Sequence, residues 1–133
     1  MRYFDENGKH NWVDENNVFV GYDSYQSCCE WADWFLAEEP QEGPPTDEDG
    51  CRDASKELLQ ELDWENWVFD ASFFYTNTEG IVLESGGIAV FRLRRKDDRR
   101  ETMYLHIFNC HNGYYGHGFE LKDRDNVKFQ GYL

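Results

Sequence analysis

The chain has 133 residues, which fits a single domain spanning residues 1–133. Its 27 Asp and Glu residues outnumber its 13 Lys and Arg residues, so the net charge is −14. Phe, Trp and Tyr make up 17% of the chain, which favours a folded domain with an aromatic core over a disordered acidic tail. The acidic balance also disfavours a general nucleic-acid binder, because such a protein needs a basic face to meet phosphates.

The first residues of the chain lack the apolar stretch of a signal peptide. No run approaches the roughly 18 apolar residues that a membrane-spanning helix requires. We therefore expect no membrane association and a cytoplasmic location, where the four cysteines would be reduced thiols. The sequence contains no phosphate-binding loop and no dinucleotide fingerprint, so we expect no cofactor.

The N-terminal segment is predicted to form antiparallel strands. Asn7-Gly8 separates residues 2–5 from residues 9–13, and Asn-Gly supplies the positive φ angles of a tight hairpin turn. Residues 18–22 are rich in β-branched and aromatic side chains and predict a further strand.

Two helices are predicted next. Apolar residues recur at i, i+3, i+4, i+7 and i+8, which is the pattern of one helical face: Cys28, Trp31, Ala32, Phe35 and Leu36. Pro40 limits this helix to about residues 27–39. A second helix is expected over about residues 51–63. An acidic loop that contains all three prolines, residues 38–50, joins the two.

The remainder of the chain predicts an antiparallel sheet. Alternating apolar residues mark strands at 66–76, 88–95, 102–111, 115–122 and 127–132. Trp67, Phe69, Ala71, Phe73 and Tyr75 are expected on one buried face, as are Ala89, Phe91 and Leu93. Together the elements predict an α+β fold, with one or two helices packed on one face of a sheet of hairpins.

One candidate site is a histidine-rich hairpin near the C-terminus. If the connection is a five-residue loop over 112–116, His111 and His117 are cross-strand neighbours and could share a metal ion. If the turn is the tighter Asn112-Gly113, the two histidines separate. A closed zinc site needs four ligands, and these residues provide two.

A second candidate is Cys29, which falls in the first turn of the predicted helix. The positive end of a helix lowers a thiol pKa, and a nearby histidine could act as its base. The adjacent Glu30 acts in the opposite direction. A third candidate, a stripe that includes Arg92, Arg94 and Lys96, could bind phosphate or could simply pair with acidic side chains.

The acidity itself suggests a function. Residues 1–80 hold 20 acidic and 4 basic side chains. We expect a non-enzymatic interaction domain that presents an anionic surface to a basic protein partner. A special case of this hypothesis is an inhibitor that imitates nucleic acid. The residues expected at this surface are Glu38, Glu39, Glu42, Asp47, Glu48 and Asp49. The alternative is a metal-binding protein or small enzyme that uses His111, His117 and Cys29.

Three short motifs resemble a family of small bacterial and phage proteins known as a domain of unknown function. They are the Gln-x-Cys-Cys-Glu stretch at 26–30, Trp67-x-Phe69, and Asn-Gly-Tyr-Tyr at 112–115. Ser27 and Gly116 depart from the residues most often found in that family. The resemblance implies a shared architecture in which segments 28–30 and 112–115 lie near each other. It implies no activity, because none is assigned to the family.

Overall fold

The computed structural model describes residues 1–24, 31–41, 58–77, 87–98, 100–110 and 117–133. Within these ranges the protein is built from strands and one short 3₁₀ helix, η1, at Trp64–Asn66. The strands are β1 (Arg2–Glu6), β2 (Lys9–Val13), β3 (Val18–Asp23), β4 (Trp31–Ala37), β5 (Trp67–Asn77), β6 (Gly87–Arg95), β7 (Thr102–Cys110), β8 (Gly118–Asp123) and β9 (Asn126–Tyr132). No helix in the described part of the chain has the length and apolar character of a membrane-spanning segment.

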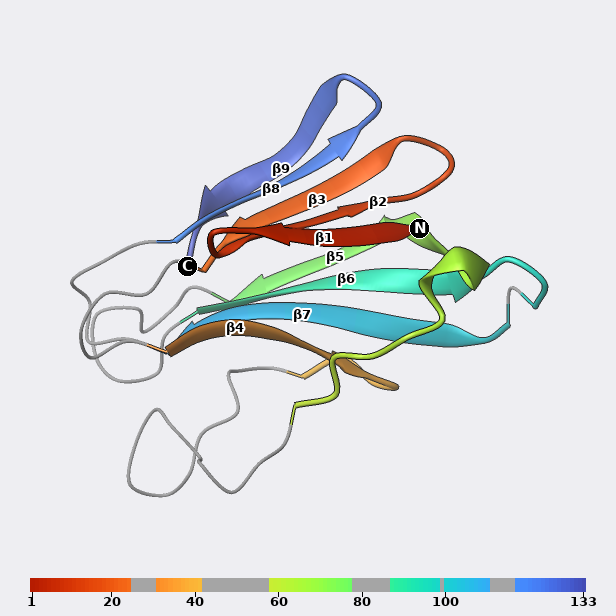
Figure 1. Ribbon diagram of the computed structural model, residues 1–133, viewed down its shortest axis with the longest axis horizontal. Helices are drawn as coiled ribbons and strands as arrows, with labels where there is room; N and C mark the ends of the chain where they lie inside the picture. The colour runs from red at the N-terminus through yellow and green to blue at the C-terminus, as the bar shows by residue number, and fades with distance from the viewer. Residues whose placement is uncertain (25–30, 42–57, 78–86, 99, 111–116) are drawn as a thin grey trace.

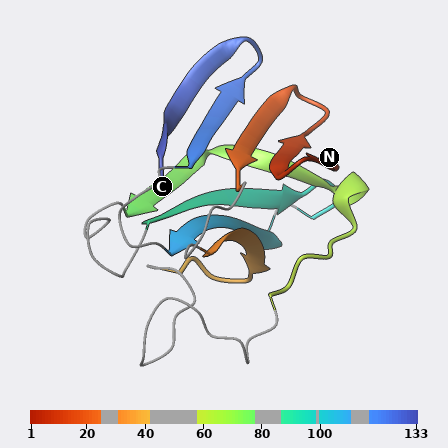
Figure 2. The same cartoon turned by 60° about the vertical axis from the view of Figure 1, so that its left-hand side comes forward.

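The strands form two antiparallel sheets that face each other as a sandwich (Figure 1, Figure 2). One sheet has five strands in the order β1-β2-β3-β8-β9, and the other has four in the order β4-β7-β6-β5. The C-terminal hairpin β8–β9 therefore joins the sheet of the N-terminal strands, beside β3. This pairing brings together strands that lie about a hundred residues apart in sequence.

The predicted α+β fold is wrong, and the first predicted helix shows why. Residues 31–37 form the strand β4 and pair with β7. Ala32, Trp34 and Leu36 face the core between the sheets, while Phe35 packs on the opposite face. A strand buried on both faces carries a nearly continuous apolar run, and such a run also satisfies helical spacing.

The second predicted helix is also wrong where it can be compared. Residues 51–57 lie outside the described residues, and 58–63 form no helix. Instead the Leu36 amide donates to the Leu59 carbonyl at 2.8 Å, and the Gln60 side chain donates to the Trp34 carbonyl at 2.7 Å. The segment therefore runs along the edge strand β4 and satisfies its backbone.

Other expectations are confirmed. Asn7 and Gly8 have φ angles of 52° and 84° and connect β1 to β2. Ala89, Phe91 and Leu93 are buried on one face of β6. The alternation predicted for β5 fails, because a register shift between Asp70 and Phe74 reverses the faces. Phe74 packs against the core between the sheets, whereas Phe73 and Tyr75 pack outside it.

The core between the sheets is aromatic. Trp12 from the five-stranded sheet meets Trp34 from the four-stranded sheet edge-on, with ring centroids 5.3 Å apart. Two polar groups tie the layers together. The Tyr22 hydroxyl donates to the Phe108 carbonyl at 2.6 Å, and the Asp14 carboxylate accepts from the Phe69 amide at 2.9 Å. These contacts hold the five-stranded sheet rigidly on its partner.

Candidate ligand-binding groove

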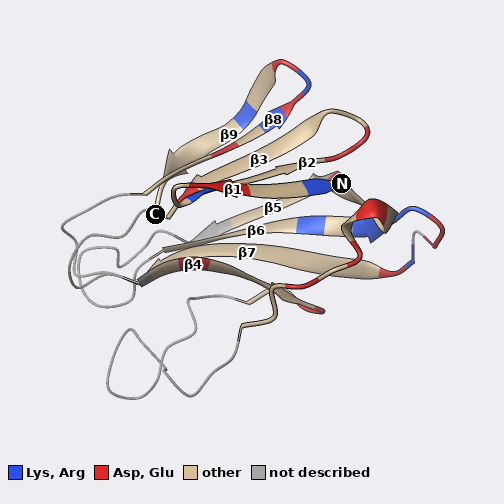
Figure 3. Ribbon diagram, viewed as in Figure 1, with Lys and Arg blue, Asp and Glu red and all other residues tan. Residues whose placement is uncertain are grey.

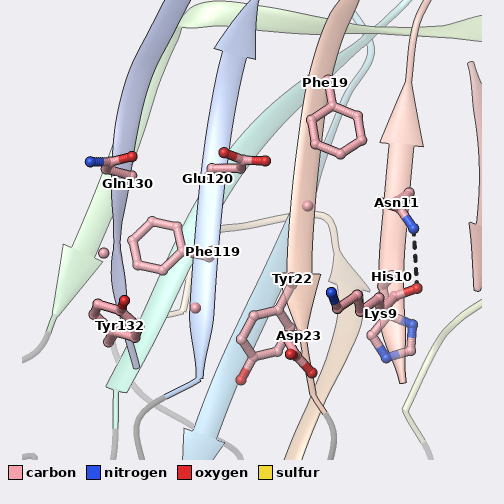
Figure 4. Close-up of a pocket in the computed structure, with 13 residues that line it drawn as sticks. Lys9, His10, Asn11, Phe19, Tyr22, Asp23, Phe119, Glu120, Gln130 and Tyr132 are labelled. Atoms are coloured by element: carbon pink, nitrogen blue, oxygen red, sulfur yellow. Dashed lines mark hydrogen bonds between the residues drawn. The ribbon is translucent and has the colours of Figure 1, made fainter. Parts of the chain in front are cut away.

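A groove of about 510 Å³ lies on the five-stranded sheet, across β2, β3, β8 and β9 (Figure 4). This volume falls within the roughly 300–1,000 Å³ of small-ligand sites. The side chains that point to the outside of the sheet alternate along each strand with those that enter the core. The outward-facing residues that line the groove are Lys9, Asn11, Phe19, Gly21, Asp23, Gly118, Glu120, Gln130 and Tyr132.

Two glycines, Gly21 and Gly118, line the groove, and an aromatic ring lies beside each. A Cβ at Gly21 would lie 2.9 Å from Cε1 of Phe19, and a Cβ at Gly118 would lie 3.6 Å from Cε1 of Tyr132. At Gly21 the missing side chain leaves the space that the Phe19 ring occupies, whereas at Gly118 a Cβ would make only ordinary contact with the Tyr132 ring. Aromatic covering of strand glycines is a recognised device of β-sheets. The outcome is two flat apolar platforms within a polar surface.

The two rings are open to solvent to different degrees. Tyr132 is 72% exposed, although most large aromatic side chains are buried in folded proteins. Phe19 is half-buried, and the ammonium of Lys122 lies 6.0 Å from its ring centroid. Large exposed aromatic groups rimmed by polar side chains are typical of binding surfaces.

Polar side chains surround these platforms. Glu120 lies between the two rings on β8, Gln130 lies beside it on β9, and Lys9 extends from β2 over β3 (Figure 4). Asn11 donates to the Lys9 carbonyl at 3.1 Å, which fixes its amide at the edge of the groove. Amide, carboxylate and ammonium groups together provide both donors and acceptors.

The charges around the groove are of both signs, unlike the acidic excess of the whole chain. Lys9 lines the groove with Asp23 and Glu120, and Lys122, which lies outside the lining, is 3.6 Å from Glu120. Figure 3 shows both signs on the β8–β9 hairpin. A surface with two charges of each sign in a protein of net charge −14 exerts little field of its own.

A chain of hydrogen bonds lies beneath the groove, on the core side. The Tyr3 hydroxyl and His10 Nδ1 are 2.8 Å apart, His10 Nε2 and Ser24 Oγ are 2.6 Å apart, and Ser24 donates to the Gly8 carbonyl at 3.1 Å. Burial lowers the pKa of His10. A neutral His10 that donates from Nε2 therefore accepts from Tyr3. Because the Ser24 proton is directed to a carbonyl, this chain braces the hairpin and does not activate a nucleophile.

Only one residue of the predicted histidine site, His117, lies within the described residues. His117 is buried, donates from Nδ1 to the Asp23 carbonyl at 3.0 Å, and exchanges backbone hydrogen bonds of 2.9 Å with Leu133. His111 and Cys29 lie outside the described residues. In the described ranges, no cluster of three or more His, Cys, Asp or Glu residues could hold a metal ion. The sites at His111, His117 and Cys29 stay predictions.

His106 lies on the opposite side of the molecule, on the outer face of the four-stranded sheet. Its ring stacks on Phe35 with centroids 4.3 Å apart. Nδ1 donates to the Tyr104 carbonyl at 3.1 Å, and Nε2 accepts from the Gln41 amide at 2.9 Å. Burial lowers the pKa of His106 to about 4, so the ring is neutral and acts as a structural connector.

The basic stripe pairs with acidic side chains. Asp70 lies 2.6 Å from Nε of Arg94 and 3.6 Å from Nε of Arg92, and Lys96 lies 3.3 Å from Glu15. These pairs favour intramolecular neutralisation over phosphate binding.

Asp63 belongs to the same end of the molecule. Its carboxylate accepts hydrogen bonds from Asn66 and Trp67 and lies 3.1 Å from Arg95. These contacts, in that order, lower the pKa of Asp63 to about 2. Asp63 therefore has a structural task, which is to fix η1 and the start of β5.

The predicted acidic interaction surface is described at its first two residues. Glu38 and Glu39 are exposed directly after β4, whereas Glu42, Asp47, Glu48 and Asp49 lie outside the described residues. Binding of a basic partner there stays a prediction.

Sequence reasoning missed the groove, although its signal is present. Gly21 and Gly118 occur at strand positions, where glycine indicates a close approach. Phe19 is two residues from Gly21 on one strand, and Tyr132 is two residues from Gln130 on another, so each ring shares a strand face with a groove residue. The pairing of β3 with β8 was the missing information.

Comparison of the chain with protein-family models, with curated proteins and with solved structures finds no match. The resemblance to the family of small bacterial and phage proteins rests on the sequence motifs alone and stays a prediction.

Proposed function

We propose that the protein is a non-catalytic binding domain that holds its ligand in the groove on the outer face of the five-stranded sheet. The observation that supports this proposal best is the pair of aromatic rings, Phe19 and Tyr132, that line the groove beside Gly21 and Gly118. An exposed ring on a surface normally gains nothing for folding, because its apolar face stays in water. A ligand that covers the ring removes this area from water, so the exposed Tyr132 contributes to binding.

The construction of the sheet agrees with this role. The groove residues belong to strands rather than to loops, and sites on strands hold their side chains in fixed positions. Beneath them, the Tyr3–His10–Ser24 chain and the Tyr22 hydroxyl are fully engaged inside the sandwich. A preformed surface loses little conformational entropy when it binds.

A library of small polar compounds tests the proposal. Amide shifts in ¹H–¹⁵N NMR spectra would be recorded with sugars, amino acids, nucleosides and short peptides. We expect the compounds that bind to perturb amides of β2, β3, β8 and β9 around Gly21 and Gly118. Binding compounds whose perturbed amides lie consistently on the four-stranded sheet, or a library without any binding compound, would contradict it.

A further inference from the structure

We infer that the ligand of this groove is a neutral oligosaccharide. The inference rests on the proposed function and adds the chemical class of the ligand. A sugar ring has an apolar face of C–H groups and a rim of hydroxyls. The C–H groups carry partial positive charge and pack favourably on the negative face of an aromatic ring. Phe19 and Tyr132 offer two such faces.

The polar residues of the groove match the rim of a sugar. Vicinal hydroxyls both donate and accept, and planar carboxylates and amides can pair with two of them at once. Glu120 lies between the two rings and Gln130 lies beside Glu120 (Figure 4). Lys9 and Asn11 supply donors on the far side of the groove. Each ring thus has hydrogen-bonding groups within reach of a sugar stacked on it.

The charges of the groove disfavour anionic ligands. Of the residues that line it, Lys9 is positive and Asp23 and Glu120 are negative, Lys122 lies 3.6 Å from Glu120, and the protein as a whole carries −14. A single-stranded nucleic acid could also stack on exposed rings, but its binding grooves are positively charged. The negative charge of the protein repels an acidic polysaccharide as well as a nucleic acid. A neutral ligand is not repelled.

The spacing of the rings indicates a ligand of several sugar units. Phe19 lies on β3 and Tyr132 on β9, with β8 between them. Two strand spacings place these strands roughly 10 Å apart, and the rings are further offset along the strands because Phe19 is opposite Lys122 while Tyr132 is opposite Gly118. A single sugar cannot cover both rings, whereas a chain laid diagonally across β8 can.

Isothermal titration calorimetry with a panel of hexasaccharides tests this inference. The neutral members are cellohexaose, xylohexaose, mannohexaose, maltohexaose and hexa-N-acetylchitohexaose, and the charged comparisons are oligogalacturonate and a single-stranded oligonucleotide. We expect at least one neutral member to bind, with an affinity that stays constant between about 50 and 500 mM salt. The charged compounds should not bind.

Variants assign the binding to the groove. Tyr132→Ala should weaken the bound neutral hexasaccharide about tenfold, and Tyr132→Phe should leave it within about twofold. Val127→Ala is the matched control, because Val127 is an exposed apolar residue on the same strand that does not line the groove. Its affinity should equal that of the wild type.

The outcomes separate the inference from the proposed function. If no neutral hexasaccharide binds while library compounds of another class map to the groove, the ligand class is wrong and the binding domain stands. If hexasaccharides bind with equal affinity to Tyr132→Ala and wild type, the groove is not their site and the inference is overturned. If neither hexasaccharides nor library compounds bind, both fail.

Discussion

The outer faces of the two sheets have opposite characters. On the four-stranded sheet, the outward residues Phe35, Ile88, Val90 and Phe108 are at most 8% exposed and form a second apolar cluster. On the five-stranded sheet, the outward residues that line the groove are glycines, polar residues and the rings of Phe19 and Tyr132. The first face contributes to stability, and we propose that the second binds a ligand. In this proposal the same β-sandwich divides its two outer faces between folding and binding.

Truncation of an aromatic residue on each face should show the largest difference. Phe108→Ala removes a fully buried ring, and we expect a loss of about 3–5 kcal/mol in the free energy of unfolding. Phe19→Ala removes a half-buried ring and should cost about 1 kcal/mol or less. Urea denaturation of both variants gives the comparison. Equal losses would show that the two faces do not differ in this way.

Acid should lower stability through His106, on the apolar outer face of the four-stranded sheet. The pKa of His106 is about 4, below its ordinary value of 6.5, so the unfolded state binds a proton more readily than the folded state. The stability contributed by the neutral His106 is therefore full above pH 6.5, falls as the pH drops from 6.5 towards 4, and is lost below that. The contribution of this residue is about 3 kcal/mol.

A non-titrating variant isolates the effect of His106 from that of other groups. His106→Gln keeps polar atoms near the Gln41 amide and has no proton to gain in this range. We expect its stability to decline less between pH 6.5 and 4 than that of the wild type, as measured by urea denaturation at a series of pH values. Parallel declines would rule out a role for His106, and His10, whose pKa burial also lowers, would be the next residue to replace.

A pair of glycine substitutions on the outer face of the five-stranded sheet should have a smaller effect on stability. A Cβ at Gly21 would meet the Phe19 ring at 2.9 Å, so Gly21→Ala must displace it, whereas Gly118 has 3.6 Å of space. We expect Gly21→Ala to be less stable than Gly118→Ala by about 1 kcal/mol, as seen in thermal unfolding. Equal stability of the two variants would show that the Phe19 ring does not lie over Gly21.

The smallest effect on stability is expected at Tyr132. This residue is 72% exposed, so Tyr132→Ala should change the free energy of unfolding by less than about 0.5 kcal/mol. A larger loss in urea denaturation would mean that the ring stabilises the fold, and its exposure would then need no ligand to account for it.

The sequence predicted local features better than long-range ones. Asn7-Gly8 and the alternation of Ala89, Phe91 and Leu93 were sufficient to predict a hairpin and a buried strand face. The segment 31–37 was mistaken for a helix, because a strand buried on both faces shows no alternation. The bulge in β5 could not be predicted, since its only trace is a change in which of Phe73 and Phe74 enters the core.

The groove depends on pairing that the sequence does not reveal. Its two platforms come from β3 and from β8–β9, which are distant in the chain and adjacent in the sheet. The sequence predicts all three strands but not that they lie beside one another. Histidines and acidic residues are conspicuous by composition, whereas the glycines and rings of the groove matter by their position in the sheet.

Hydroxyl-radical footprinting tests the central claim most directly, because it measures both outer faces in one experiment. In the free protein, we expect rapid oxidation of Tyr132 and measurable oxidation of Phe19, with Phe35 and Phe108 protected. The neutral hexasaccharide that binds most tightly should protect Tyr132 and Phe19 and leave the other two unchanged. Two results would contradict the division between the buried outer face of the four-stranded sheet and the binding face of the five-stranded sheet. One is oxidation of Phe108 in the free protein at a rate comparable to that of Tyr132. The other is no protection of Tyr132 at saturating ligand.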